Sequence, residues 1–223
     1  SPDYRLFFGA LENLYPGTPL ADDIAGTRDS ISDITIDNLH ENFDLFYHPS
    51  QMHLLVIGKF DVDPILQVLK EYDQISQLPS IKMERFPVEK NEVKLNQSCR
   101  MDVATPKLAI GIRGNDDIKE EEKFRYKLML KLLFSMMFGW TSQRFQSLYE
   151  AGKIDNSLTL EVEVEELFHF VILTMDTQEP VSLSHQFRSA IKQFEKDPDV
   201  NQEHLDTIKS EMFGDFLQGL NSL

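Results

Sequence analysis

Histidine is the residue type in this chain with the clearest capacity for metal or acid–base chemistry. A zinc site built on one helix needs two histidines on the same face with a carboxylate between them, so that both ring nitrogens and a base converge. The closest pair, His48 and His53, is separated by the helix-breaking Pro49. We therefore predict no metal ligand and no cofactor in this chain. The six histidines are His40, His48, His53, His169, His185 and His204.

Other catalytic chemistries have no sequence support either. The chain has no G-x-S-x-G elbow, no phosphate-binding loop and no G-x-G-x-x-G fingerprint. Cys99 is the single cysteine, so an intrachain disulfide is excluded. We interpret Cys99 as a buried or half-buried structural residue in a strand, because no histidine can be placed to activate it. We predict no catalytic and no cofactor-binding residues.

The composition predicts a folded, acidic protein. Apolar residues make up 41% of the 223 residues, and the net charge is −15. Nucleic acids and anionic membranes both need clustered Lys and Arg, so we expect neither as a partner. No apolar run approaches the roughly 18 residues that cross a bilayer. The N-terminal residues SPDYRLFF do not form a signal peptide. The lone cysteine fits a reducing compartment, or a bacterial protein that does without disulfides, and we expect a cytoplasmic location.

The first part of the chain predicts helices around one buried strand. Apolar spacing indicates a helix over residues 4–15 and a second from Thr35, its N-cap, to Phe46. Between them, Asp29 or Ser30 is expected to cap a short turn. The run MHLLVIG, residues 52–58, is typical of a buried strand, and Asp63-Pro64 is expected to start a helix to about residue 72.

The second part begins a new set of elements after a polar, proline-containing stretch. We predict a linker over residues 76–90, strands over 93–99 and 107–113, and a helix over 119–138. Thr141 or Ser142 is expected to cap the next helix, to about 149. A hairpin follows over 157–165 and 168–175, then helices over 180–194 and from 201 onward. Strict alternation places Leu160 and Val162 against the helices, and Glu161 and Glu163 on the opposite face.

The order of elements predicts an α+β fold, with antiparallel sheets covered by helices, rather than alternating βαβ units. Residues 15–58 also carry an ordered set of short motifs: aromatic-Pro, D-I-A-G-T, S-I-x-x-I-T, F-Y-H-P-S and an apolar strand. This order resembles the second half of the N-terminal domain of M16 zinc peptidases, the relatives of pitrilysin and mitochondrial processing peptidase. The resemblance implies LuxS/MPP-like units: residues 1–75 as the end of a first unit and 91–223 as a second, inactive-type unit that is incomplete.

The catalytic residues of the M16 family do not map onto this sequence. The resemblance implies that the zinc motif H-x-x-E-H and the glutamate ligand lie upstream of Ser1, so we expect the chain to be a fragment without the metal centre. Glu12 lies too late to be that ligand and is expected to be a solvated helix residue. The substrate-orienting Arg and Tyr of the family correspond to Tyr149 and Asn156 here. Arg144, one turn before Leu148, is expected to lie on the surface.

The resemblance suggests two functions. The first is a non-catalytic part of an M16 peptidase-like protein, which shapes a peptide-binding chamber and contacts a second M16-like half or subunit. The alternative is part of an active zinc metalloendopeptidase whose H-x-x-E-H motif lies upstream, with zinc and a peptide or protein substrate bound by the parent. The segment L-Y-E-x-G-x-I-D is similar to a bacterial subgroup linked to modification of elongation factor P.

Overall fold

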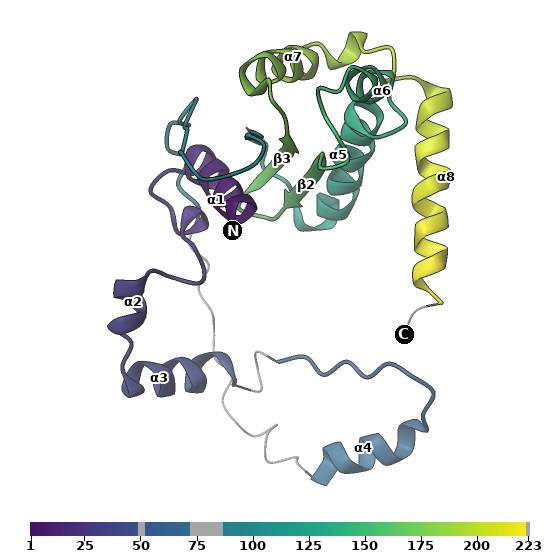
Figure 1. Cartoon of the computed structure of the whole chain (residues 1–223). Coiled ribbons are helices and arrows are strands. Elements are labelled where there is room, and N and C mark those ends of the chain that lie inside the picture. The colour runs from purple at the N-terminus through teal and green to yellow at the C-terminus, as the bar shows by residue number, and fades with distance from the viewer. Residues whose placement is uncertain (49–51, 72–86, 222–223) are drawn as a thin grey trace. The chain divides into compact units, whose positions relative to one another are not determined.

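A computed structural model describes residues 1–48, 52–71 and 87–221 of the chain (Figure 1). The chain divides into two compact units. Unit 1 contains Ser1–Asp23 and Pro87–Leu217, and unit 2 contains Ile24–Phe86 and Gln218–Leu223. Most of the predicted linker, 76–90, lies outside the described residues, so the predicted family units at 1–75 and 91–223 stay a prediction.

The sheet of unit 1 consists, within the described residues, of three antiparallel strands in the order β1-β3-β2. The strands are β1 (Lys107–Arg113), β2 (Thr159–Val164) and β3 (His169–Asp176). The predicted hairpin is confirmed, with Val162 opposite Val171. β1 pairs with the other side of β3, with Ile110 opposite Leu173. The central strand β3 is buried along nearly its whole length.

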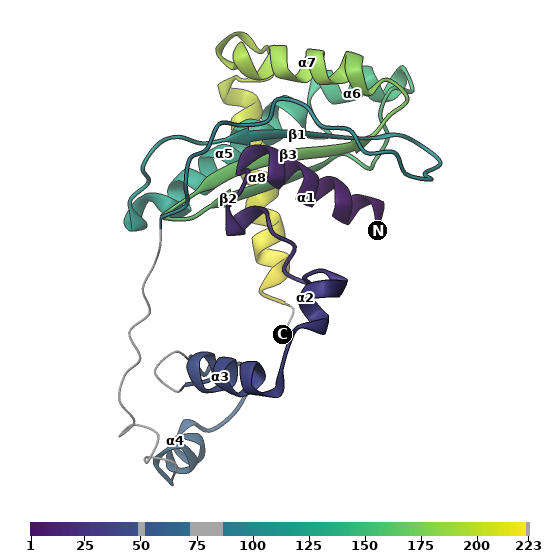
Figure 2. The same cartoon turned by 90° about the vertical axis from the view of Figure 1, so that its left-hand side faces the viewer.

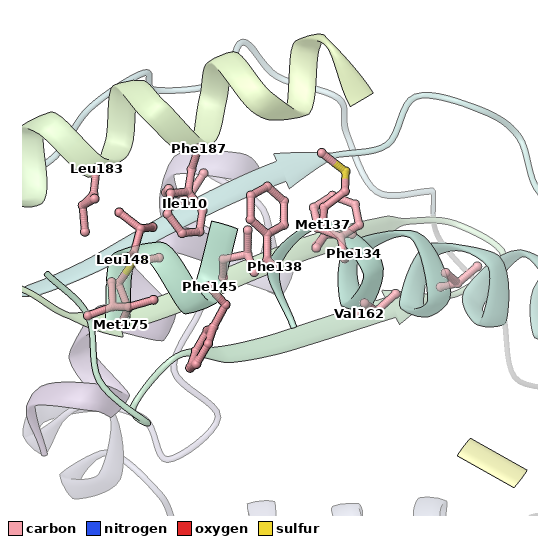
Figure 3. Packing of buried hydrophobic residues seen from close by; sticks show 14 of the residues in the cluster. Ile110, Phe134, Met137, Phe138, Phe145, Leu148, Val162, Met175, Leu183 and Phe187 are labelled. Carbon is pink, nitrogen blue, oxygen red and sulfur yellow. The ribbon is translucent and has the colours of Figure 1, made fainter. Parts of the chain in front are cut away.

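One face of this sheet carries the larger core. Helices α5 (Lys123–Phe138), α6 (Gln143–Glu150) and α7 (Pro180–Lys192) supply its apolar side chains. Figure 3 shows Phe134 and Phe138 of α5 above the strands, with Phe187 of α7 close to Phe138. The rings of Phe138 and Phe187 stack at 4.8 Å between centroids. Val162 and Leu173 contribute to the same core from the sheet.

Helix α1 (Pro2–Leu14) covers the opposite face of β1 and β3 (Figure 2). Leu14 packs directly over Gly111, where a Cβ atom would lie 3.0 Å from the leucine side chain. Tyr15 follows the helix, and its hydroxyl donates a hydrogen bond of 2.9 Å to the His169 carbonyl. Burial raises the pKa of Tyr15 to about 12, so this donor keeps its proton at physiological pH. Both faces of the sheet therefore carry a helical layer.

The alternation predicted for β2 is present. Val162 and Val164 are buried in the core under the helices, whereas Glu161 lies opposite Ile172, which belongs to the core under α1. The glutamate face is not simply solvated, because Lys127 of α5 forms an ion pair of 2.9 Å with Glu163. A second lysine of α5, Lys123, pairs with Glu165 at 3.1 Å.

A buried polar network joins the start of α6 to the start of α8 (Gln202–Gly219). The Asp197 side chain is only 2% exposed and forms an ion pair with Arg144. The other Asp197 oxygen accepts the N–H of Asp199, whose carboxylate accepts the N–H of Gln143 at 2.9 Å. Arg144, which was expected on the surface, is 27% exposed, and its guanidinium is tied into this network. Its guanidinium also lies 5.6 Å from the ring centroid of Phe138.

Unit 2 contains α2 (Arg28–Ser32), α3 (Ile36–Phe46) and α4 (Val62–Glu71). Thr35 caps α3 as predicted. The cap of α2 is Thr27, not Asp29 or Ser30, because Ser30 occupies the third helical position and bonds back to Thr27. Short 3₁₀ turns elsewhere in the chain span Pro19–Ala21, Glu120–Glu122 and Phe194–Lys196.

Two predicted strands are absent from the described residues. Residues 52–58 and 93–99 have no ladder partner and adopt no regular structure, although their apolar composition favours a strand. Cys99 is accordingly exposed rather than buried, which corrects the prediction. A strand needs a neighbour to satisfy its backbone groups, and sequence patterning alone cannot provide one. The predicted helices over 4–15, 119–138, 141–149 and 180–194 are present within a few residues.

We predict opposite outcomes for two adjacent residues of β2. Val162→Asp should lower the free energy of unfolding by about 3–5 kcal/mol, because it places an unpaired carboxylate in the core. Glu163→Gln should cost less than about 1 kcal/mol, because the ion pair with Lys127 is partly exposed. Urea denaturation of both variants measures the difference. A larger loss for Glu163→Gln would contradict the assignment of the two faces.

We also predict that the α6–α8 network depends on the Asp197 carboxylate. Asp197→Ala should lower the free energy of unfolding by about 2–4 kcal/mol, because it leaves the Arg144 guanidinium and the Asp199 N–H without their acceptor. Glu195→Ala is the matched control: this nearby side chain is exposed, and its removal should change stability by less than about 0.5 kcal/mol. Thermal and urea denaturation measure the stability of both variants. Equal losses of unfolding free energy would contradict the prediction.

Candidate functional site

The histidines are dispersed over the structure. His40 is exposed on α3, His53 is exposed in an irregular segment, and His185 is exposed on α7. His204 uses both ring nitrogens within the protein, at 2.9 Å from the Thr141 hydroxyl and 3.0 Å from the Asp199 carbonyl. None of these four side chains is therefore part of a converging ligand set.

His169 is the buried histidine of β3. Its ring packs edge-on against Tyr126 at 5.3 Å between centroids, and Nε2 has no hydrogen-bond partner among the described residues. The ring occupies the space where Gly114 would otherwise carry a side chain, since a Cβ there would lie 1.6 Å from Nε2. Burial lowers the pKa of His169, Asp116 opposes this effect and Lys90 reinforces it. His169 is therefore a core residue that packs against Tyr126 and fills the space over Gly114.

The residues present do not fit a zinc ion. Within the described residues, no group of three or more His, Cys, Asp or Glu side chains is placed to hold a metal. Glu12 forms a 2.8 Å ion pair with Lys94 instead of facing another potential ligand. We therefore assign no chemical step to a metal in this chain, and the absence of bound zinc stays a prediction for metal analysis.

The segment that aligns with the substrate-orienting Arg and Tyr of the family has a different arrangement here. Tyr149 lies exposed on α6, with its ring stacked on Phe145 at 5.8 Å between centroids. Asn156 follows α6 and lines a pocket beside the start of β2. Neither side chain provides the positive charge of the family arginine, so the structure provides no oxyanion clamp at these two positions.

That pocket, which we call the β2 pocket, has a volume of about 240 Å³. Leu160 and Leu173 of the sheet line it, together with aromatic residues of α5, α6 and the turn between them. The aromatic members are Phe134, Phe138, Trp140 and Phe145. The sequence analysis missed Trp140, although a tryptophan directly after the Phe138-Gly139 helix end is a detectable signal.

Trp140 is held at the pocket by a hydrogen bond. Its indole Nε1 donates to the Glu211 carboxylate of α8 at 3.0 Å, while the side chain as a whole is 63% exposed. An aromatic side chain that is both exposed and fixed in this way is typical of a binding surface, because it presents apolar area at little cost in conformational entropy. The pocket is therefore lined mainly by apolar side chains, with one exposed aromatic ring held in place beside it.

Acidic side chains lie on the other face of β2. Glu163 and Glu165 are paired with lysines, but no ion pair is formed by Glu161 within the described residues. Burial, followed by the hydrogen bond and charge of Glu163, raises the pKa of Glu161. An additional cation at Glu161 would relieve this repulsion.

A larger hollow of about 480 Å³ lies between α6, α7 and the turn at 193–198. It contains Arg144, His185 and Lys196, but Arg144 is already neutralised by Asp197. The lining of this hollow is largely polar and includes an ion pair that is already formed, so we take the apolar β2 pocket as the candidate site.

Comparison with known proteins identifies the family. The Peptidase M16 inactive domain matches residues 33–212. The chain is 33% identical over 226 residues to the uncharacterized zinc protease YmfH of Bacillus subtilis strain 168, covering 100% of this chain and 52% of that protein.

Two solved structures have the same fold. A candidate M16-like peptidase from Alicyclobacillus acidocaldarius superimposes with a TM-score of 0.82 at 23% identity, covering 99% of this chain and 53% of that one. A protease from Helicobacter pylori gives 0.76 at 17% identity, covering 100% and 54%. The chain thus spans about half the length of the relatives it matches. Because the family domain matches most of its residues, the chain belongs to the M16 peptidase family and carries the inactive domain of that family.

Proposed function

We propose that this chain is the non-catalytic part of an M16 peptidase-like protein, where it shapes a peptide-binding chamber and contacts a second half. The proposal depends mainly on one observation, the apolar surface of residues 24–71. No described residue in this range is buried. Apolar side chains that are patterned for burial, such as Leu39, Phe43 and Leu55, are 58–80% exposed.

An apolar surface of this kind indicates contact with another protein segment. Soluble monomers rarely expose large contiguous apolar patches, and those that do usually use them for binding. The relatives are about twice as long as this chain. We therefore propose the remaining half of an M16 protein as the cover, rather than a membrane or a nucleic acid. No helix among the described residues is both long and apolar enough to cross a bilayer.

The second candidate is an active zinc metalloendopeptidase to which this chain contributes no ligand. The observation that favours it is the name of the Bacillus subtilis relative, a zinc protease. On this proposal the parent protein binds zinc outside residues 1–223 and acts on a peptide or protein. The cytoplasmic location and the link to elongation factor P stay predictions.

The proposed assembly can be tested by splitting the protein. Co-expressed as a separate polypeptide, the remaining half of the parent should co-purify with this chain, because it covers the apolar side chains of α3. Phe43→Glu should weaken the association at least about tenfold, since it places a charge in that contact. Phe124→Glu is the matched control, an exposed phenylalanine of α5 in unit 1, and should leave the affinity unchanged. Equal effects of the two variants would contradict the proposal.

The two candidates differ in their metal content. We expect the purified chain to hold no stoichiometric zinc and to cleave no unstructured peptide, because its potential ligands do not converge. Metal analysis and a chelator-controlled peptide assay measure both properties. One zinc ion per chain, lost on His53→Ala, would refute the expectation. Chelator-sensitive cleavage by the full-length parent alone would select the second candidate.

A further inference from the structure

His169 lies where four elements of unit 1 meet. It is the first residue of the central strand β3, and it is only 4% exposed. Its carbonyl oxygen accepts two hydrogen bonds of 2.9 Å, one from the Tyr15 hydroxyl after α1 and one from the Gly114 N–H after β1. Its ring packs edge-on against Tyr126 of α5. One residue therefore links the helical layers on both faces of the sheet to the end of β1.

The imidazole ring of His169 is enclosed without a hydrogen bond at Nε2. This atom is buried and has no partner among the described residues. Gly114 leaves the room that the ring needs, since a Cβ atom there would lie 1.6 Å from Nε2. Both nitrogens of an imidazolium are donors, whereas the neutral ring leaves one of them with a lone pair. A charged donor without an acceptor is the costlier group to bury, so this niche favours the neutral ring.

One charge of each sign acts on the ring. Asp116, in the loop after β1, favours the imidazolium, and Lys90, in the segment before β1, disfavours it. The Asp116 carboxylate already accepts the Tyr126 hydroxyl at 3.1 Å, and burial together with this bond raises the pKa of Tyr126, which stays uncharged. Val164 lies opposite His169 on β2 and carries no charge. Burial is therefore the largest influence on His169, and it lowers the pKa of the ring.

We propose that His169 is an acid-sensitive latch of unit 1: the neutral ring holds the junction of α1, β1 and β3 closed, and protonation below about pH 6.5 loosens it. The imidazolium can reach water only if the ring leaves its niche over Gly114. That movement displaces the residue whose carbonyl holds both Tyr15 and Gly114. The latch is a property of the fold and does not depend on assembly with a second half.

The direction of the pH effect follows from proton linkage. A histidine whose pKa is lower in the folded chain than in the unfolded chain binds fewer protons when folded. Its contribution to stability is complete above about pH 6.5, the ordinary pKa of imidazole, and decreases as the pH falls below that value. With a ring that stays neutral in the folded chain, this residue alone raises the unfolding equilibrium constant by at most about thirtyfold between pH 7.5 and pH 5.

Two other histidines of unit 1 lack this combination of burial and a missing partner. His185 is exposed on α7. His204 has a partner at each ring nitrogen, the Thr141 hydroxyl at one and the Asp199 carbonyl at the other. His185 is therefore the matched control, because its replacement removes a titrating ring and leaves the latch intact.

Urea denaturation of the 223-residue chain at pH 7.5 and pH 5 measures the latch. His169→Phe removes the titrating group and keeps a flat ring against Tyr126, and His169→Leu does so with a side chain that needs less room beside Gly114. In both variants the unfolding equilibrium constant should rise at least about threefold less between the two pH values than in the unmodified chain. His185→Leu should reproduce the pH dependence of the unmodified chain within about 1.5-fold.

Amide hydrogen exchange followed by NMR tests where the chain opens. The Gly114 N–H bonds to the His169 carbonyl, whereas the Ala151 N–H bonds to Ser147 at the end of α6. After correction for the intrinsic pH dependence of exchange, protection of Gly114 should fall at least about threefold from pH 7.5 to pH 5.5 in the unmodified chain. It should fall less than about 1.5-fold in His169→Phe, and protection of Ala151 should be the same in both proteins.

Three outcomes would overturn the proposal. The first is an equal pH dependence of unfolding in the unmodified chain and in both His169 variants. The second is a steeper dependence in the variants, because Asp116 would then stabilise the imidazolium in the folded chain. The third is an equal loss of protection at Gly114 and Ala151, which would assign the effect to unit 1 as a whole. None of these results bears on the co-purification assay with Phe43→Glu.

Discussion

Unit 1 depends on the burial of β3 on both of its faces. Alternate residues of this strand belong to two different cores: Val171, Leu173 and Met175 to the core under α5–α7, and Phe170 and Ile172 to the core under α1. β3 is also the only strand of the described sheet with a neighbour on each side, so it supplies the backbone partners for both β1 and β2. A one-residue register shift in β3 would exchange the two sets of side chains and disrupt both cores together.

The edge position of β2 follows from this central role of β3. Within the described residues β2 has only β3 as a neighbour, so the backbone groups on its other side pair with no strand. Lys127 of α5 forms an ion pair with Glu163 at one end of β2. The aromatic residues at the end of α5 lie beside Leu160, at the other end of β2. Within the described residues no metal-holding group is assembled, whereas the edge strand β2 has one apolar face and one acidic face.

The sequence predicted correctly those elements whose partners are near in the chain or whose apolar and polar residues alternate strictly. The hairpin at Val162 and Val171 and the Thr35 cap are examples, because alternation and capping are local properties. The strands at 52–58 and 93–99 were predicted wrongly, since apolar composition does not specify a partner strand. Arg144 and Asp197 are 53 positions apart in the chain, and no local pattern indicates their contact. The β2 pocket escaped prediction for the same reason: its walls come from two helices and two strands.

The docking of α1 has a consequence for the time course of synthesis. Arg113 donates hydrogen bonds to the carbonyls of Leu14 and Asn91, and Tyr15 bonds to His169, which lies 154 positions later in the chain. Within these 223 residues, the packing of α1 and Tyr15 on the sheet is therefore complete only after β3 has left the ribosome. At typical translation rates of about 5–20 residues per second, that delay is roughly 8–30 s. Throughout this interval α1 is a natural client for chaperones that hold apolar segments.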